Sequence, residues 1–329
     1  MTKKQFTSMF PTEEAAINYF YRIRYDGILT CPHCGATDKV YRCHNRPKAC
    51  RCKSCDTMFS PFKDTIFEKS TTPLMDWFDV IRMFLNARKG ISSLELHRDL
   101  GVTGKATWRM LHQVRLAMED KAFVKFSGEV EVDEMYLGGN PPRYPKSRIT
   151  GLYLPRPEIK RGRGTDHVAV LGLRERKSGR VYAQVMPLEL STKGGYKRLS
   201  GPQIKAVLDE RCEPGTIFIT DEFKGYGFLD KGVRVALWLI DDEVPPPPCK
   251  HYTVCHKAGR FTDGHGHSTN GMESHWALSK RGYHGTYHFM SGKYMQRYLD
   301  EFCFRQNTRK LSSLEAFDLL LKQSVLKRI

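Results

Sequence analysis

The sequence predicts an α/β protein whose mixed-sheet domain is preceded by a small four-cysteine module and a helical domain. Two CxxC pairs lie close together near the start of the chain, and three amphipathic segments follow between residues 74 and 118. From residue 129 onward, short alternating or continuous apolar runs take their place, with helical patterns between them. Strand-like runs separated by helical segments are typical of an α/β layer.

Length and charge limit the functional classes. A chain of 329 residues is long enough for two or three domains. Its net charge of +17 favours a polyanionic partner, most often nucleic acid. The longest apolar runs have six residues, no amphipathic basic helix stands out, and Met1 to Phe10 does not read as a signal peptide. We therefore expect a cytoplasmic protein with no membrane partner.

Residues 1–29 have the apolar content of a short helical lead-in, and a cysteine-rich segment follows. Ten cysteines in a cytoplasmic protein favour metal binding over disulfides. Two CxxC pairs separated by 17 residues fit a tetrahedral zinc ribbon, and four thiolates leave no open position, so the zinc is expected to be structural. The predicted ligands are Cys31, Cys34, Cys52 and Cys55. The alternatives for one ligand are Cys43, Cys50, His33 and His44.

Three helices are predicted next, in the short helix, glycine turn, longer helix layout of a helix-turn-helix. They run from residue 74 to Gly90, from about Ser92 to Leu100, and from the cap residue Thr103 onward. Lys105, Arg109 and His112 are spaced to share the outward face of the third helix, which we expect to be the recognition helix for DNA. The alternative is an ordinary helical hairpin with solvated charges.

The second half of the chain alternates strand and helix patterns. A helix opens at Pro202, a short helix is expected after Asp221, and a late helix begins at Ser268 or Thr269 and ends at Gly282. A last helix follows with Tyr294, Tyr298 and Phe302. The predicted strands cover residues 130–136, 168–173, 181–186, 216–220 and 233–240.

Three carboxylates lie in or at the ends of these predicted strands and helices. Asp133 is in the first strand, Asp221 ends the fourth, and Glu273 shares a helix face with Trp276 and Lys280. Carboxylates at strand ends and on a packed helix can bind two Mg²⁺ ions about 4 Å apart. Each also has a plainer interpretation: Asp133 as a residue of an edge strand, Asp221 as a helix cap, and Glu273 in a solvated charged face.

The motifs CPHCG, CKSC, VEVDEMYLGG, ITDEFKGY and TNGMESHWALSKRGYHGTYHFMSGKYMQRYLDEFCFRQN together resemble those of DDE-type insertion-sequence transposases. The resemblance spans roughly residues 25–310. It implies a ribonuclease H-like catalytic domain in which Asp133, Asp221 and Glu273 bind two Mg²⁺ ions, with Mn²⁺ as a substitute. It also implies that Lys280 contacts the DNA end. Asn270 is the alternative third ligand, and His256 is a further candidate for metal or phosphate contact.

The resemblance implies an enzyme that binds the ends of an insertion sequence, cleaves the DNA and transfers the 3′-hydroxyl ends to target DNA, as an oligomer on double-stranded DNA. The alternatives are a DNA-binding regulator with an inactive nuclease domain, and a nuclease that cuts without joining. The expected domains are residues 1–60 with the ribbon, 61–125 with the helix-turn-helix, 126–310 with the catalytic site, and a tail at 311–329. A basic insertion at 140–165 is expected to bind DNA through Arg143, Lys146, Arg148, Arg156, Lys160, Arg161 and Arg163.

Overall fold

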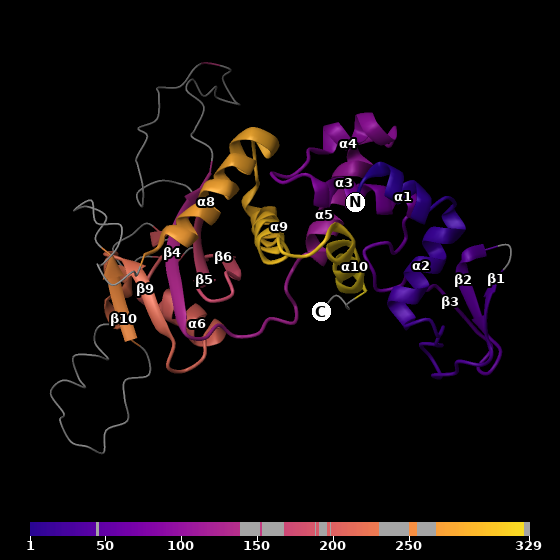
Figure 1. Ribbon diagram of the computed structural model, residues 1–329, viewed down its shortest axis with the longest axis horizontal. Coiled ribbons are helices and arrows are strands. Elements are labelled where there is room, and N and C mark those ends of the chain that lie inside the picture. The colour runs from indigo at the N-terminus through magenta and orange to yellow at the C-terminus, as the bar shows by residue number, and fades with distance from the viewer. Residues whose placement is uncertain are drawn as a thin grey trace. The chain divides into compact units, whose positions relative to one another are not determined.

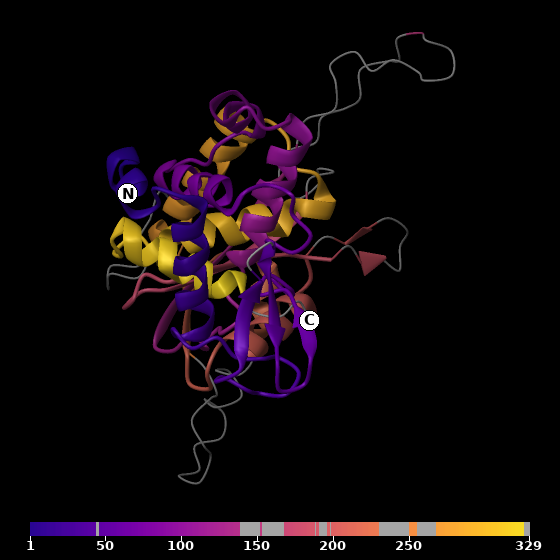
Figure 2. The same ribbon diagram turned by 90° about the vertical axis from the view of Figure 1, so that its right-hand side faces the viewer.

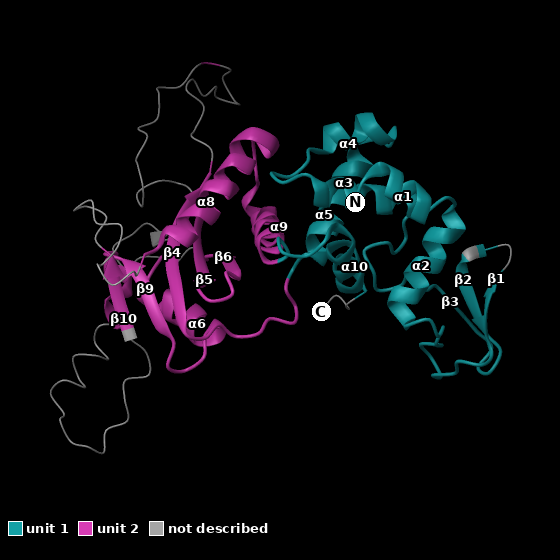
Figure 3. Cartoon of the chain, viewed as in Figure 1, with its two compact units in different colours: residues 1–119, 308–329 teal, residues 120–307 magenta. Residues whose placement is uncertain are grey.

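The computed structural model describes the chain at residues 1–43, 46–138, 152, 168–187, 189–190, 196–197, 199–229, 250–254 and 268–325 (Figure 1). The chain forms two compact units (Figure 3). Unit 1 combines residues 1–119 with the C-terminal residues 308–329, and unit 2 consists of residues 120–307. The expected ribbon and helix-turn-helix segments therefore lie in one unit.

Helices make up most of unit 1, and polar caps set where several of them begin. The side chains of Thr12, Ser92 and Thr103 accept hydrogen bonds from backbone amides three residues later. The turn between the second and third predicted helices needs Gly101, whose φ is +66°. The helices are α1 (Lys3–Met9), α2 (Glu13–Tyr25), α3 (Leu74–Asn86), α4 (Ser93–Leu100), α5 (Gly104–Ala117) and α10 (Ser313–Ser324).

Aromatic residues from distant parts of the sequence form the core of unit 1. The ring of Phe78 in α3 meets that of Phe317 in α10 edge-on at 5.3 Å, and Phe10 contacts both. Phe317, Leu320 and Leu321 of α10 are fully buried. The segment that we expected to be a tail thus contains a core helix. The apolar spacing in Phe317-x-x-Leu320-Leu321 is the signal that the sequence analysis missed.

The cysteine-rich segment of unit 1 is a three-stranded antiparallel sheet, whose strands lie side by side at the indigo end of the chain (Figure 2). Its strands are β1 (Val40–Cys43), β2 (Arg46–Cys52) and β3 (Thr57–Phe59). The sheet joins the helices through an aromatic contact, because Phe62, just beyond β3, stacks on Phe20 of α2 at 5.1 Å.

Unit 2 is built on a five-stranded sheet in the order β10-β9-β4-β5-β6. Strands β4, β5 and β6 are antiparallel neighbours, and β9 and β10 extend the sheet in parallel from β4. This is the ribonuclease H-like mixed sheet that was expected. The strands are β4 (Glu129–Leu137), β5 (Val168–Glu175), β6 (Val181–Val185), β9 (Ile217–Asp221) and β10 (Lys250–Val254), with a separate hairpin of β7 (Glu189–Leu190) and β8 (Tyr196–Lys197).

The parallel edge strand β10 was not predicted. Residues 250–254 lie in a polar stretch, and their strand character comes from pairing with β9 rather than from an apolar pattern. The strand that we predicted at residues 233–240 lies outside the described residues.

Helices cover both faces of the sheet. On one face, Val130 and Val132 of β4 pack with Ile204 and Leu208 of α6. On the other, Met135 of β4 packs with residues of α8 and α9. These elements are α6 (Gly201–Arg211), α8 (Asn270–Gly282) and α9 (Met295–Asn307), with short helical turns η2 (Lys224–Tyr226), η4 (Tyr283–Tyr287) and η5 (Gly292–Tyr294). Among the helices described, none is long and apolar enough to cross a bilayer.

Candidate active site and zinc centre

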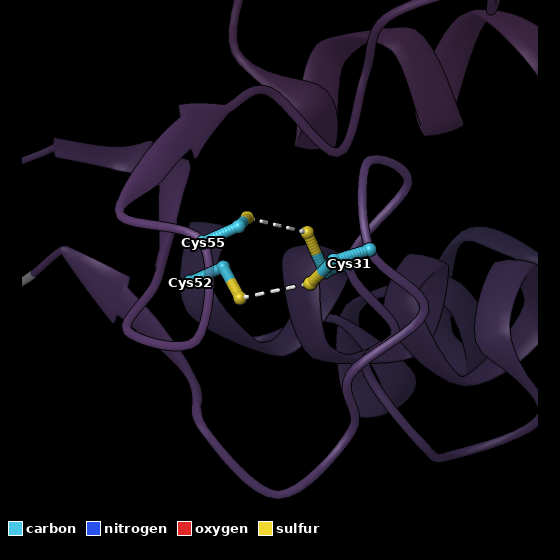
Figure 4. Close-up of side chains that lie close together, drawn as sticks. Cys31, Cys52 and Cys55 are labelled. Atoms are coloured by element: carbon cyan, nitrogen blue, oxygen red, sulfur yellow. Dashed lines mark hydrogen bonds between the residues drawn. The ribbon is translucent and has the colours of Figure 1, made fainter.

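The four predicted zinc ligands of unit 1 converge. The Sγ atoms of Cys31, Cys34, Cys52 and Cys55 all lie within 4.8 Å of one another. Cys31 and Cys55 approach to 3.7 Å and Cys34 and Cys52 to 3.5 Å (Figure 4). Four thiolates at Zn–S distances of about 2.3 Å lie about 3.8 Å apart at the corners of a tetrahedron. The cysteine cluster therefore fits one zinc ion.

The alternative ligands take other positions. Cys50 is fully buried, with its sulfur 3.7 Å from the hydroxyl of Tyr21 in α2. His33 is exposed, and neither it nor Cys43 belongs to the cysteine cluster. His44 lies outside the described residues.

The predicted recognition helix, α5, is partly as expected. Lys105 and Arg109 are exposed, but His112 is only 3% exposed. The expectation that His112 faces outward was wrong, because α3, α4 and α10 all pack around α5 and cover more of its surface than a simple hairpin does. His112 lies under the ring of Trp108, at 4.2 Å between ring centroids.

Asp133 and Asp221 occupy equivalent positions along two neighbouring parallel strands of the unit 2 sheet. Asp133 is on the central strand β4, so its interpretation as an edge-strand residue was wrong. Glu131 pairs with Ile219 where β4 and β9 run parallel, and Asp133 and Asp221 follow two residues later on their strands. Since strand side chains alternate between faces, both aspartates are on the face that α8 covers.

The interpretation of Asp221 as a helix cap was wrong, because the N-cap of η2 is Phe223 and no side chain caps that helix. Asp221 instead makes a local hydrogen bond in the turn before η2. Its Oδ1 accepts a hydrogen bond of 2.9 Å from the backbone amide of Phe223, where the chain turns into η2. This bond holds one side of the carboxylate in a fixed orientation, and it is compatible with a metal-binding role for the other oxygen.

Glu273 is carried by α8, which lies very close to the sheet. Gly172 of β5 pairs directly with Asp133, and a Cβ atom there would lie 2.3 Å from the Trp276 ring and 2.4 Å from the Met272 methyl group. Trp276 is 4% exposed. Glu273 and Lys280, which we expected on one face with it, are exposed. Trp276 of α8 therefore packs against the sheet, while Glu273 and Lys280 lie on the exposed part of the helix.

The negative charges of Asp221 and Glu273 act on Asp133, although the ligand oxygens of these three carboxylates do not all lie within 4.8 Å of one another as the four cysteine sulfurs do. Burial, followed by the negative charges of Glu134, Asp221 and Glu273, raises the pKa of Asp133 to about 7. The bond from the amide of Glu134 to Asp133 Oδ1, 2.9 Å long, only partly offsets this. Carboxylates that repel one another in this way are a donor set that suits hard divalent cations such as Mg²⁺. The acidic cluster is defined here as Asp133, Asp221 and Glu273.

Two residues near the acidic cluster were not identified from the sequence. Glu134 follows Asp133 and accepts a hydrogen bond of 3.0 Å from the hydroxyl of Tyr226, which is fully buried. Burial and the charges of Glu134, Asp133 and Asp221 raise the pKa of Tyr226 far above its usual value. Tyr226 therefore stays protonated and acts as a hydrogen-bond donor.

The remaining candidates divide into two groups. Asn270 and Lys280 lie on α8, the first one turn before Glu273 and the second in the last turn, and both are exposed. The others lie outside the described residues, as does almost all of the insertion at 140–165. They are His256, Arg143, Lys146, Arg148, Arg156, Lys160, Arg161 and Arg163.

The fold and the two sites define a ribonuclease H-like protein with an N-terminal zinc ribbon. The chain belongs to the family described as "ISXO2-like transposase domain", whose model matches residues 125–235 and 244–307, more than half of the chain. A second model, "Transposase zinc-ribbon domain", matches residues 11–58. These matches confirm the resemblance to insertion-sequence transposases.

One relative spans nearly the whole chain. It is 27% identical over 324 residues, which cover 96% of this chain and 98% of the relative, and it is described as an uncharacterized protein in transposable element ISH50 of Halobacterium salinarum.

Two solved structures show weak similarity to the chain. The pre-cleavage Mos1 transpososome matches with a TM-score of 0.28 and 12% identity, over 76% of this chain and 79% of the other. The Mos1 strand transfer complex matches with a TM-score of 0.22 and 11% identity, over 70% and 76%. Scores this low give no information about the site.

Proposed function

We propose that the protein is an active DNA transposase that binds the ends of its element, cleaves the DNA and joins the 3′-hydroxyl ends to target DNA. The observation that carries the proposal is the acidic cluster, which takes Asp133 from the central strand β4, Asp221 from the neighbouring strand β9 and Glu273 from helix α8. It is supported by membership of a transposase family, whose matched region includes all three carboxylates.

Asp133, Asp221 and Glu273 would hold the catalytic metal. Two Mg²⁺ ions in such a site supply an activated water or 3′-hydroxyl and neutralise charge on the leaving oxygen. The chain's own residues orient this donor set: the amide of Glu134 holds Asp133, the amide of Phe223 holds Asp221, and α8 brings Glu273 to the sheet. Mn²⁺ would substitute because it accepts the same oxygen ligands.

DNA is the proposed partner of both units. Exposed Lys105 and Arg109 on α5 would contact DNA near the element ends, and Lys280 on α8 would contact the DNA end beside the acidic cluster. The basic residues of the 140–165 insertion would add phosphate contacts to flanking or target DNA. Because two ends must be joined, we propose that the protein works as an oligomer on DNA.

A cleavage and joining assay tests this function. The full-length, zinc-loaded protein is incubated with Mg²⁺ and labelled DNA from both flanks of its own gene, beside an Asp221→Asn variant. We expect cuts at discrete flanking positions and joined products, both lost in the variant. Cutting without joining would indicate a nuclease. Zinc-dependent binding without cutting would indicate a DNA-binding regulator, and either result would overturn the proposal.

A further inference from the structure

A buried ion pair lies beside the acidic cluster, on the same strand. Glu131 of β4 precedes Asp133 by two residues, points to the same face of the sheet and is only 2% exposed. Its Oε1 accepts a hydrogen bond of 2.7 Å from Nη1 of Arg174, its cross-strand partner on β5. Nε of Arg176 lies 3.7 Å from the same oxygen. The carboxylate is therefore held by one cation on the neighbouring strand and faces a second cation just beyond the end of that strand.

The second oxygen of Glu131 binds the first turn of α8. The backbone amide of Met272, the residue before Glu273, donates to Oε2 at 2.8 Å, and it shares this hydrogen with the carbonyl of Thr269 at 3.0 Å. Amides of a first helical turn lack partners within the helix, and a carboxylate there is favoured both by the hydrogen bond and by the helix dipole. Glu131 thus caps α8 from the sheet.

Gly271 allows this close approach. A Cβ atom at this position would lie 2.0 Å from Nη1 of Arg174 and 2.7 Å from Oε2 of Glu131. Any side chain would push Arg174 away from Glu131 or lift the first turn of α8 off the strand. The sequence Asn270-Gly271-Met272-Glu273 therefore places a glycine where the ion pair contacts the helix backbone.

We propose that Glu131 is a positioning residue for Glu273. Through the Met272 amide it fixes the start of α8 to β4, the strand that carries Asp133, and so sets the separation of the two carboxylates that would share the metal. This inference rests on the proposed function, since it takes Glu273 as a metal ligand. Glu131 itself binds protein groups rather than the metal.

The test measures metal affinity and helix order in the full-length, zinc-loaded protein. Mn²⁺ affinity is determined from the electron paramagnetic resonance signal of free Mn²⁺, and amide exchange is followed over residues 268–282. In Glu131→Ala and in Gly271→Ala we expect Mn²⁺ affinity to fall about tenfold or more and exchange in the first turn of α8 to rise. Glu131→Gln keeps an acceptor for the Met272 amide and should largely rescue both properties.

Gly285→Ala is the matched control, because a Cβ atom there meets no heavy atom within 4 Å. It should leave both measurements unchanged. If Glu131→Ala does not fold, Gly271→Ala tests the same contact from the helix side. Wild-type Mn²⁺ affinity in Gly271→Ala would overturn the inference, and so would equal losses in Glu131→Gln and Glu131→Ala.

Asp133→Asn separates this inference from the function on which it rests. It should abolish Mn²⁺ binding in unit 2. If Asp133→Asn loses Mn²⁺ while Gly271→Ala keeps it, the positioning role alone fails. If Asp133→Asn still binds Mn²⁺ like the wild type, the proposed metal site fails and the positioning role falls with it.

Discussion

Gly172 and Asp133 are direct partners across the antiparallel ladder of β4 and β5, and Trp276 fills the space that a side chain at Gly172 would need. A glycine within a strand often marks the close approach of another element. Here that element is α8, which carries Glu273. The absence of a side chain at one residue therefore sets how near the helix comes to the central strand.

Replacing Gly172 with alanine should separate α8 from the sheet. The new methyl group would overlap the Trp276 ring, which belongs to a buried indole and cannot rotate away freely. We expect a loss of about 1–3 kcal/mol in the free energy of unfolding, as for other overpacked cores. A displacement of the Glu273 carboxylate by about 1 Å would reduce DNA cleavage by about a hundredfold.

Urea unfolding and the cleavage assay measure these two effects. Gly285→Ala in unit 2 is the control, since a Cβ atom there has no neighbour within 4 Å. Full cleavage by Gly172→Ala would show that the position of α8 does not depend on this contact.

The stability of unit 2 should depend on pH through His275. Burial lowers the pKa of this side chain from 6.5 to about 4, and its Nδ1 has no hydrogen-bond partner among the described residues. Because the folded-state pKa lies below the unfolded one, the unfolded chain binds more protons between these values. The stabilisation is complete above pH 6.5 and is lost as the pH falls toward 4, by about 3 kcal/mol in total.

Urea unfolding at a series of pH values between 4 and 7.5 checks this dependence. The variant His275→Leu removes the titrating group and should flatten the slope of unfolding free energy against pH below 6.5. Parallel slopes for the wild type and the variant would contradict the prediction.

The zinc content of the protein should depend on the four residues of the cysteine cluster. The purified protein should contain about one zinc ion per chain, and Cys52→Ser should lose it together with the order of β1 to β3, because a structural zinc site contributes directly to folding. Cys43→Ser lies outside the cluster and should retain the metal. Elemental analysis and thermal unfolding with and without a chelator provide the measurements. Equal zinc content in the two variants would contradict this ligand set.

The exposed charges of α5 should contribute to the salt dependence of DNA binding. If Lys105 and Arg109 each contact a phosphate, their double replacement by alanine should reduce the slope of log affinity against log salt by about 1.8. Lys322→Ala serves as the control, because it also removes an exposed positive charge, on α10 rather than α5. Binding is measured by fluorescence anisotropy over a range of salt concentrations. An unchanged slope in the double variant would exclude α5 as a phosphate-contacting surface.

Local patterns predicted most of the elements and the four residues of the cysteine cluster. The CxxC spacing identified the cysteine cluster, and alternating apolar residues located β4, β5, β6 and β9. The sequence motifs named Asp133, Asp221 and Glu273. These features could be predicted because each depends on residues that are close in the chain or on spacing that the chemistry requires.

Features that depend on contacts between distant residues were missed. His112 is spaced like an outward residue, but it is buried in a helix against which α3, α4 and α10 all pack. Strand β10 forms because β9 offers an edge, and Glu131 looks like any polar strand residue until Arg174 and the Met272 amide surround it. The sequence shows that residues 172 and 271 are glycines, but it does not show why a side chain is excluded there. The reason is the close packing of α8 against the sheet.

Helix α10 belongs to unit 1, although every residue of unit 2 precedes it in the chain. A ribosome therefore completes the sheet of unit 2 before it delivers Phe317, whose ring packs in the core of unit 1. During synthesis, unit 1 is therefore the first unit to begin and the last to be completed. Until α10 is made, the apolar side chains of α2, α3 and α5 that pack against it stay exposed. A frameshift before the codon of Phe317 would leave the sheet of unit 2 intact and still remove the residues that α10 contributes to the core of unit 1.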